Sequence, residues 1–205
     1  MGELIRWLRD RGWTVQVWLS ESHNHHIVAK RSRTATYIGV DGGETVGLAV
    51  VGSGFILTAQ KTFGDVQRAI VGTYDAVRGA IIYGEKRRKP IHLGIEAGYC
   101  PSHIAVAFAY GLWSAIMMTY SHRVYPFLVQ PHRKPPNRTV KIASLKYALF
   151  DQDLAHSRFN KDESLSDEVS VGNIQHSVSA FGIIEALWEN AKTEGVQTSE
   201  ETEKG

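Results

Sequence analysis

The sequence predicts an α/β fold: a mixed five-stranded sheet, with an antiparallel meander first and parallel strands after it, flanked by helices. Between residues 36 and 62, three short apolar segments alternate with glycine-containing turns, which is typical of a meander. Beyond residue 62, apolar segments of strand length alternate with longer segments of helical period, which indicates parallel strands connected by helices. Residues 1–35 precede this pattern as a small N-terminal extension made of a helix and a hairpin.

The extension has a pattern of its own. Apolar residues at helical spacing before Gly12 predict a short amphipathic helix that ends at this glycine. Residues 13–20 then alternate as a strand, and 27–30 form the second strand of a hairpin whose turn, 22–26, holds three histidines. These histidines are either an exposed hairpin tip or a metal site. The lack of a second, spaced group of ligands favours the tip.

The meander is expected to contain three strands. The first is short and apolar and ends on a carboxylate, Asp41, before the turn residues Gly42 and Gly43. A second turn, Gly52-Ser53-Gly54, separates the other two strands. The predicted strands are 37–41, 46–51 and 55–62.

Helices and parallel strands are expected to alternate after the meander. Apolar residues recur every three or four positions from Asp65 to Tyr83, and Gly84 and Pro90 mark the end of this helix. A buried type of strand follows and again ends on a carboxylate, Glu96. In order, we expect a helix at 65–83, a strand at 91–96, a helix at 101–121, a strand at 124–130, a helix at 139–150 and a final helix at 167–192.

Composition restricts the class of protein. The chain has 205 residues, of which 43% are hydrophobic and 21% charged, so it can bury the core of one globular domain. A single cysteine, Cys100, excludes an intramolecular disulfide framework and suits a reducing compartment. The apolar segment 104–118 is short for a membrane span, and the N-terminus lacks the apolar stretch of a signal peptide. We therefore expect a soluble cytoplasmic protein that does not bind a membrane.

Charge is unevenly distributed along the chain. The net charge is +2, but the tail from Glu194 to Gly205 has four glutamates and one lysine, so it carries −3 and the rest carries +5. Basic residues cluster at 30–33, 86–89 and 133–141, which suits either a polyanion or solvated loops. The expected organisation is an extension at 1–35, a domain at 36–192 and an acidic, disordered tail at 193–205.

Two carboxylates at strand ends are the candidate reactive groups. Asp41 ends the first strand of the meander and Glu96 ends the strand at 91–96, and in a mixed sheet of this order the two strands are expected to be neighbours. Carboxylates brought together repel each other and favour a hard divalent cation, Mg²⁺ or Mn²⁺. Taken alone, an Asp such as Asp41 before two glycines is usually a turn residue. Glu96 follows an apolar segment in which an unpaired carboxylate would be costly.

These motifs resemble those of RuvC-type Holliday-junction resolvases. The segment Tyr37-Ile38-Gly39-Val40-Asp41-Gly42-Gly43 is similar to the opening motif of that family, and Leu93-Gly94-Ile95-Glu96-Ala97-Gly98-Tyr99 is similar to its second motif. The following helix, the strand at 124–130 and Thr139-Val140-Lys141 match in order and spacing. The resemblance covers about residues 36–192 and leaves 1–35 unexplained.

The resemblance implies an RNase H-like fold, a homodimer, and cleavage of four-way DNA junctions with two Mg²⁺ or Mn²⁺ ions in each active site. Asp41 and Glu96 fall on the first two metal-binding acids of the family, and Tyr99 falls on an aromatic residue that stacks at the opened junction. Lys141 falls near a lysine that faces the scissile phosphate. Further DNA contacts are expected from Arg133, Lys134 and Arg138.

The last helix departs from the family pattern, which has two acids, or a histidine and an acid, three residues apart. The best match places Asn173 and His176 on the two metal-ligand positions, and a shift by one turn places His176 and Ser179 there instead. A histidine could bind the cation or act as a general base. Asp167 and Glu168, upstream, could supply the missing charge. This altered motif and the extra N-terminal segment are compatible with a phage-encoded protein, in a bacterial or phage-infected cell.

The sequence leaves three functions open. The first is a junction-resolving endonuclease that makes paired symmetric cuts. The second is an RNase H-like nuclease for other branched DNA or for RNA–DNA hybrids. The third is a structure-specific DNA-binding protein that has lost cleavage, which the altered last helix would allow.

Overall fold

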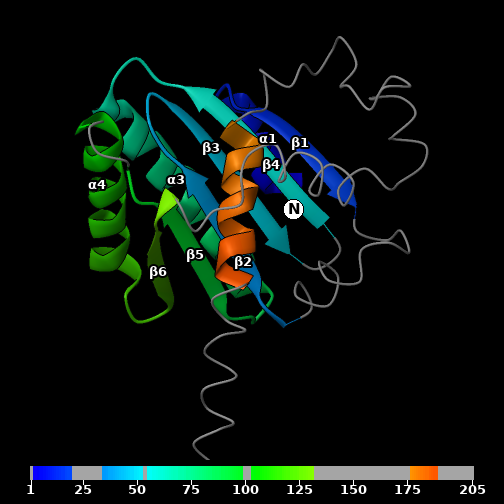
Figure 1. Cartoon of the computed structure of the whole chain (residues 1–205). Coiled ribbons are helices and arrows are strands. Elements are labelled where there is room, and N and C mark those ends of the chain that lie inside the picture. The colour runs from blue at the N-terminus through cyan, green and yellow to red at the C-terminus, as the bar shows by residue number, and fades with distance from the viewer. Residues whose placement is uncertain (1, 20–33, 53–54, 99–102, 132–175, 189–205) are drawn as a thin grey trace, which may run out of the picture.

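The protein is organised around one six-stranded sheet. The computed structural model describes residues 2–19, 34–52, 55–98, 103–131 and 176–188. Its strands, in chain order, are β1 (Thr14–Leu19), β2 (Thr36–Asp41), β3 (Thr45–Gly52), β4 (Phe55–Thr62), β5 (Ile91–Glu96) and β6 (Val124–Val129). In space they follow the order β1-β4-β3-β2-β5-β6 (Figure 1).

The pairing confirms the expected fold class. Strands β2, β3 and β4 form an antiparallel meander, and β5 and β6 extend the sheet beside β2 in parallel. The order β4-β3-β2-β5-β6 is the topology of the RNase H-like fold. All five predicted strands are present with these neighbours.

The sheet has one strand more than expected, because β1 from the N-terminal extension joins it. Residues 14–19 pair antiparallel with β4, and Thr14 lies opposite Gln60. Val15 packs against the hydrophobic core of the sheet. The alternating pattern of this segment predicted a strand, but periodicity does not show which strand it pairs with. The predicted partner at 27–30 lies outside the described residues.

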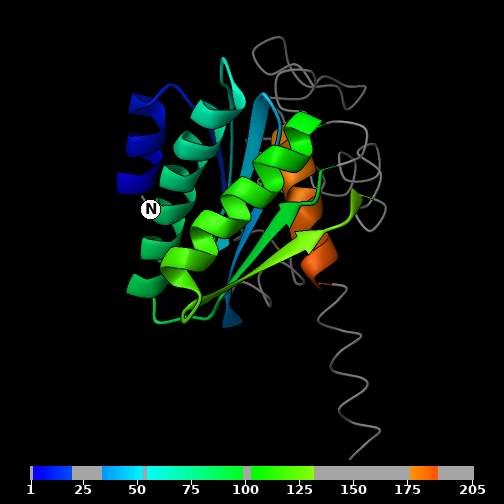
Figure 2. The same ribbon diagram turned by 90° about the vertical axis from the view of Figure 1, so that its left-hand side faces the viewer.

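Helices cover both faces of the sheet. The helices α1 (Gly2–Asp10), α3 (Val66–Lys86) and α4 (His103–Tyr120) lie on one face, and the helix at 176–188 lies on the other (Figure 2). The Asp65 side chain caps α3 by accepting a 2.8 Å hydrogen bond from the Arg68 backbone N–H. This helix continues past Gly84, the predicted end, to Lys86. An added Cβ at Gly84 would lie 3.0 Å from Ile91, so glycine here allows close packing of the helix on β5.

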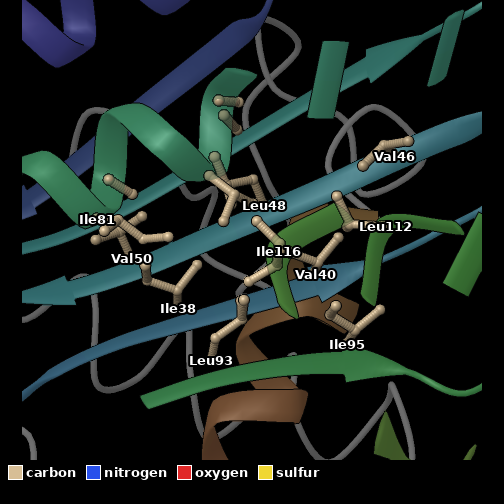
Figure 3. Close-up of a cluster of buried hydrophobic side chains, with 14 of the residues drawn as sticks. Ile38, Val40, Val46, Leu48, Val50, Ile81, Leu93, Ile95, Leu112 and Ile116 are labelled. Carbon is tan, nitrogen blue, oxygen red and sulfur yellow. The ribbon is translucent and has the colours of Figure 1, made fainter. Parts of the chain in front are cut away.

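The core lies between the sheet and the first set of helices. Its strand residues alternate along the chain, so that Ile38 and Val40 of β2 face the same side as Leu93 and Ile95 of β5. Figure 3 shows these side chains meeting residues of the helices. The labelled helix residues of this core are Ile81, Leu112 and Ile116.

Helix α4 is long and apolar enough to cross a membrane by length and composition. In the structure one face of this helix packs into the core, because Phe108, Ala109, Leu112 and Ile116 have no exposed surface and the helix packs against α3, β5 and β6. Ile104, Tyr110 and Met118 of the same helix are exposed. The indole of Trp113 donates a 3.2 Å hydrogen bond to the Pro126 carbonyl, which ties the helix to β6.

The other face of the sheet carries glycines where the helix at 176–188 crosses it. A Cβ on Gly39 would lie 2.1 Å from the Ala180 carbonyl oxygen, and one on Gly94 would lie 2.6 Å from Ile183. A Cβ on Gly47 would lie 1.9 Å from the His176 carbonyl oxygen. Glycine within strands permits this close approach of another backbone. Three neighbouring strands therefore form a smooth surface on which this helix lies.

We expect Gly39→Ala to destabilise the protein and displace the helix at 176–188. The new methyl group meets backbone rather than a flexible side chain, so the free energy of unfolding should fall by about 1–3 kcal/mol, the usual cost of overpacking. Denaturant unfolding measures this change. Gly43→Ala is the matched control, because a Cβ there has its nearest neighbour, the Thr45 carbonyl oxygen, at 3.8 Å. Equal stability of the two variants would contradict the proposed packing.

The predicted helices are described only in part. The final helix was expected at 167–192, and residues 176–188 are helical in the structure. The expected helix at 139–150 lies outside the described residues, as does the histidine-rich turn at 22–26.

Candidate active site

Asp41 and Glu96 lie side by side at the ends of neighbouring parallel strands. Val40 of β2 pairs with Ile95 of β5, and each carboxylate is the next residue of its strand. Because side chains alternate along a strand, both carboxylates point away from the face on which Val40 and Ile95 are buried. The sequence predicted this proximity, and the register of the two strands accounts for it.

The carboxylates therefore share the face covered by the helix at 176–188. Gly39 and Gly94, two residues before the carboxylates, have the same orientation and contact that helix. The side chain of Asp41 is 13% exposed, and Glu96 is half-buried. Both groups thus lie at the rim of a packed interface rather than on an open turn.

His176 contacts Asp41 directly. Its Nδ1 lies 3.0 Å from Oδ2 of Asp41, although 135 positions separate the two residues in the chain. The close approach of the His176 backbone to Gly47 brings this first described turn of the helix onto the sheet, and Gly47 pairs with Asp41 across β2 and β3. The imidazole is 40% exposed, so its outer edge faces solvent.

This contact gives the imidazole a defined chemical role. An ionised carboxylate can only accept a hydrogen bond, so Nδ1 of His176 donates to Asp41. In the neutral ring the lone pair is then on Nε2, which can accept a proton from water. The Asp41 carboxylate also fixes the orientation of the ring, as a carboxylate does for a general base.

The donor groups suit a hard divalent cation. Two partly buried carboxylates on one face bring negative charge together, and oxygen ligands of this kind bind Mg²⁺ or Mn²⁺. Within the described ranges, no three His, Cys, Asp or Glu residues are grouped closely enough to hold a metal ion. The described residues therefore form no complete metal site, and a cation at this edge of the sheet would have Asp41 and Glu96 as its carboxylate ligands among them.

Most other predicted site residues lie outside the described part of the chain. These are Tyr99, Arg133, Lys134, Arg138, Lys141, Asp167, Glu168 and Asn173. Their roles stay predictions. The structure places the predicted site residues Asp41, Glu96 and His176. The register of β2 and β5 brings Asp41 beside Glu96, and His176 contacts Asp41 directly.

The sequence reasoning missed Gln60. This residue pairs with Gly47 across β3 and β4, so its side chain lies on the same face as Asp41 and His176. Its Oε1 is buried and has no hydrogen-bond partner among the described residues. A polar residue at a core-type position of a strand, in register with Gly47, is the signal that could have drawn attention to it.

The far end of the helix at 176–188 rests on an aromatic group. The His92 ring stacks on Tyr37 with centroids 5.1 Å apart, and Trp188 meets Tyr37 edge-on at 5.7 Å. Burial lowers the pKa of the His92 imidazole below its ordinary value of 6.5. The folded protein thus favours the neutral form of this ring.

Stability should fall when the pH drops below about 6.5, because the unfolded chain then takes up a proton on His92 more readily than the folded chain. Above that pH the ring is neutral in both states and this contribution is constant. Urea unfolding of the wild type and His92→Gln between pH 5 and 8 measures the difference, and the variant should show a shallower decline. Parallel pH profiles would exclude His92 as a source of the acid sensitivity.

The strand order is that of an RNase H-like α/β fold, and Asp41 and Glu96 lie at the ends of two of its adjacent parallel strands. One solved structure similar to this chain is that of RuvC from T. thermophilus in complex with a Holliday junction substrate. The two chains are 14% identical; the match covers 78% of this chain and 96% of that one, with a TM-score of 0.44. No protein-family model and no curated protein matches this sequence.

Proposed function

We propose that this protein is a divalent-metal-dependent endonuclease that resolves four-way DNA junctions by paired, symmetric cuts. The observation that carries the proposal is the pairing of Asp41 with His176 beside Glu96, at the ends of adjacent parallel strands. The resemblance of the Asp41 and Glu96 motifs to those of RuvC-type resolvases supports the junction as substrate.

The three side chains divide the chemistry. Asp41 and Glu96 hold Mg²⁺ or Mn²⁺, and Asp41 also orients His176. The Nε2 atom of His176 takes the proton of the attacking water, since Nδ1 is occupied by Asp41. When bound, the cation supplies positive charge that stabilises the phosphodiester as negative charge develops on it.

The proposal includes a homodimer. A four-way junction has two equivalent strands to cut, and a twofold-symmetric dimer presents two identical sites to them. Further contacts to the DNA are proposed for Tyr99, which stacks on an unpaired base, and for the basic residues after β6. Those basic residues are Arg133, Lys134, Arg138 and Lys141.

Nicking of synthetic DNA tests the proposal. A four-way junction, a flap, a linear duplex and an RNA–DNA hybrid are incubated with the protein and Mg²⁺ or Mn²⁺. Symmetric paired nicks confined to the junction are the expected result. Nicking of all branched substrates or of the hybrid would reassign the protein as a less selective nuclease, and tight junction binding without nicking would make it a binding protein.

A further inference from the structure

A groove is lined by residues at α1 and α3. These two helices lie on the face of the sheet opposite the helix at 176–188 (Figure 2). The volume of the groove is about 620 Å³. The two helices are in close contact at Gly79, where an added Cβ would lie 3.0 Å from Leu4. Leu4 and Gly79 line the groove where the helices meet, and charged and aromatic side chains line the rest.

The two helices run in opposite directions along the groove. Glu3, at the start of α1, pairs with Lys86 at the end of α3 at 3.5 Å, so Arg11, just after α1, lies toward the other end of the groove. Asp75 and Arg87 are twelve positions apart on α3, which corresponds to about 18 Å of helix. The groove is therefore long enough to follow an extended chain.

Positive charge extends along this length. The lining has four cations, and its two carboxylates are Glu3 and Asp75, so the excess is two positive charges. The cations are Arg78 and Lys86 of α3, with Arg11 just after α1 and Arg87 just after α3. Arg88 directly after Arg87 adds to the field at one end. Such a row of cations suits a ligand with regularly spaced negative charges.

Two aromatic rings accompany the arginines. The Arg11 guanidinium lies 4.1 Å from the centre of the Trp7 ring, and the Arg87 guanidinium lies 5.4 Å from that of Tyr83. A guanidinium stacked on a ring has its orientation fixed, while its N–H edge can still bind a phosphate with two hydrogen bonds. Arginines oriented in this way suit the binding of phosphate groups.

We propose that the groove between α1 and α3 is a second DNA-binding site, which holds the sugar–phosphate backbone of one strand of the junction away from the cutting site. This inference rests on the proposed function for its ligand. At about 3.4 Å of axial rise per nucleotide, 18 Å accommodates the phosphates of about five nucleotides. The groove binds DNA without reading its sequence, because phosphates carry no base information.

The decisive variant is the double charge reversal Arg11→Glu/Arg87→Glu. The matched control is Arg6→Glu/Arg9→Glu, which changes the net charge equally at exposed positions of α1 that do not line the groove. Arg78 is kept, because it also hydrogen-bonds Tyr120. Thermal unfolding establishes that both variants fold.

Affinity is measured by fluorescence anisotropy with a labelled four-way junction, in a chelating buffer that prevents cleavage, over a range of salt concentrations. The groove variant should bind about 10-fold more weakly than the control. Its slope of log affinity against log salt should be smaller by about 1.8, or 0.9 for each phosphate that the variant no longer neutralises. DNA should also quench the emission of Trp7, and this quenching should be absent in Trp7→Phe.

Equal losses of junction affinity in the two double variants would show that only net charge matters and would overturn the proposal. The proposal would also fail if the groove variant bound the junction as tightly as the wild type, or if DNA quenched the emission of Trp7→Phe as strongly as that of the wild type. Stronger displacement by polyglutamate than by single-stranded DNA would assign the groove to an acidic protein and overturn it as well. The outcome is separable from the proposed function. If the groove variant nicks junctions and binds them with normal affinity, only the proposed DNA site in the groove is rejected. If affinity depends on the groove but the protein does not nick junctions, only the proposed nuclease activity is rejected.

Discussion

We expect Asp41→Asn to abolish junction nicking while the protein still folds and binds the junction. The substitution keeps the shape of the side chain but removes its negative charge, so a hard cation loses one of its two described oxygen anions. The rate should fall by ~10³-fold or more, because the same carboxylate also orients His176. Binding should be unchanged or tighter, since one source of repulsion for phosphate is gone.

Single-turnover nicking and junction anisotropy measure the two effects on the same protein. Glu44→Gln is the matched control, because it removes a carboxylate from the β2–β3 turn near Asp41. That control should cut at the wild-type rate. Normal nicking by Asp41→Asn would remove Asp41 from the active site and leave it as a turn residue.

Replacing His176 produces the second largest effect and defines its role. His176→Ala should reduce the nicking rate by ~10²-fold, the usual contribution of a positioned general base. His176→Asn is the sharper variant, because its amide can still donate to Asp41 from the place of Nδ1 but has no group that takes a proton. We expect the Asn variant to be as slow as the Ala variant.

Each other outcome reassigns the residue. If His176→Asn cuts at the wild-type rate and His176→Ala does not, His176 is a positioning residue that acts through Asp41. If His176→Asp is active at low Mg²⁺ concentration, the position belongs to the metal, since a carboxylate suits that cation better than imidazole does. Wild-type rates for all three variants would exclude the histidine and direct attention to Asp167 or Glu168.

Local sequence patterns were sufficient to predict the strands of the sheet and the proximity of the two carboxylates. The alternation of strand 37–41 and the apolar segment at 91–96 define elements whose ends carry Asp41 and Glu96. Once parallel strands are neighbours, their carboxyl ends meet at one edge. The proximity of the two acids is thus a consequence of the element order, which the sequence itself contains.

The tertiary structure decided what lies against that edge. Periodicity identified β1 as a strand but not β4 as its partner, because pairing depends on which edge of the sheet is free. In the last helix, both registers considered from the sequence included His176, and neither predicted its contact with Asp41. That contact depends on Gly39, Gly47 and Gly94, whose missing side chains let a helix more than 80 positions away lie on the sheet. Such steric fit between distant segments leaves no periodic signal, so only the folded chain shows it.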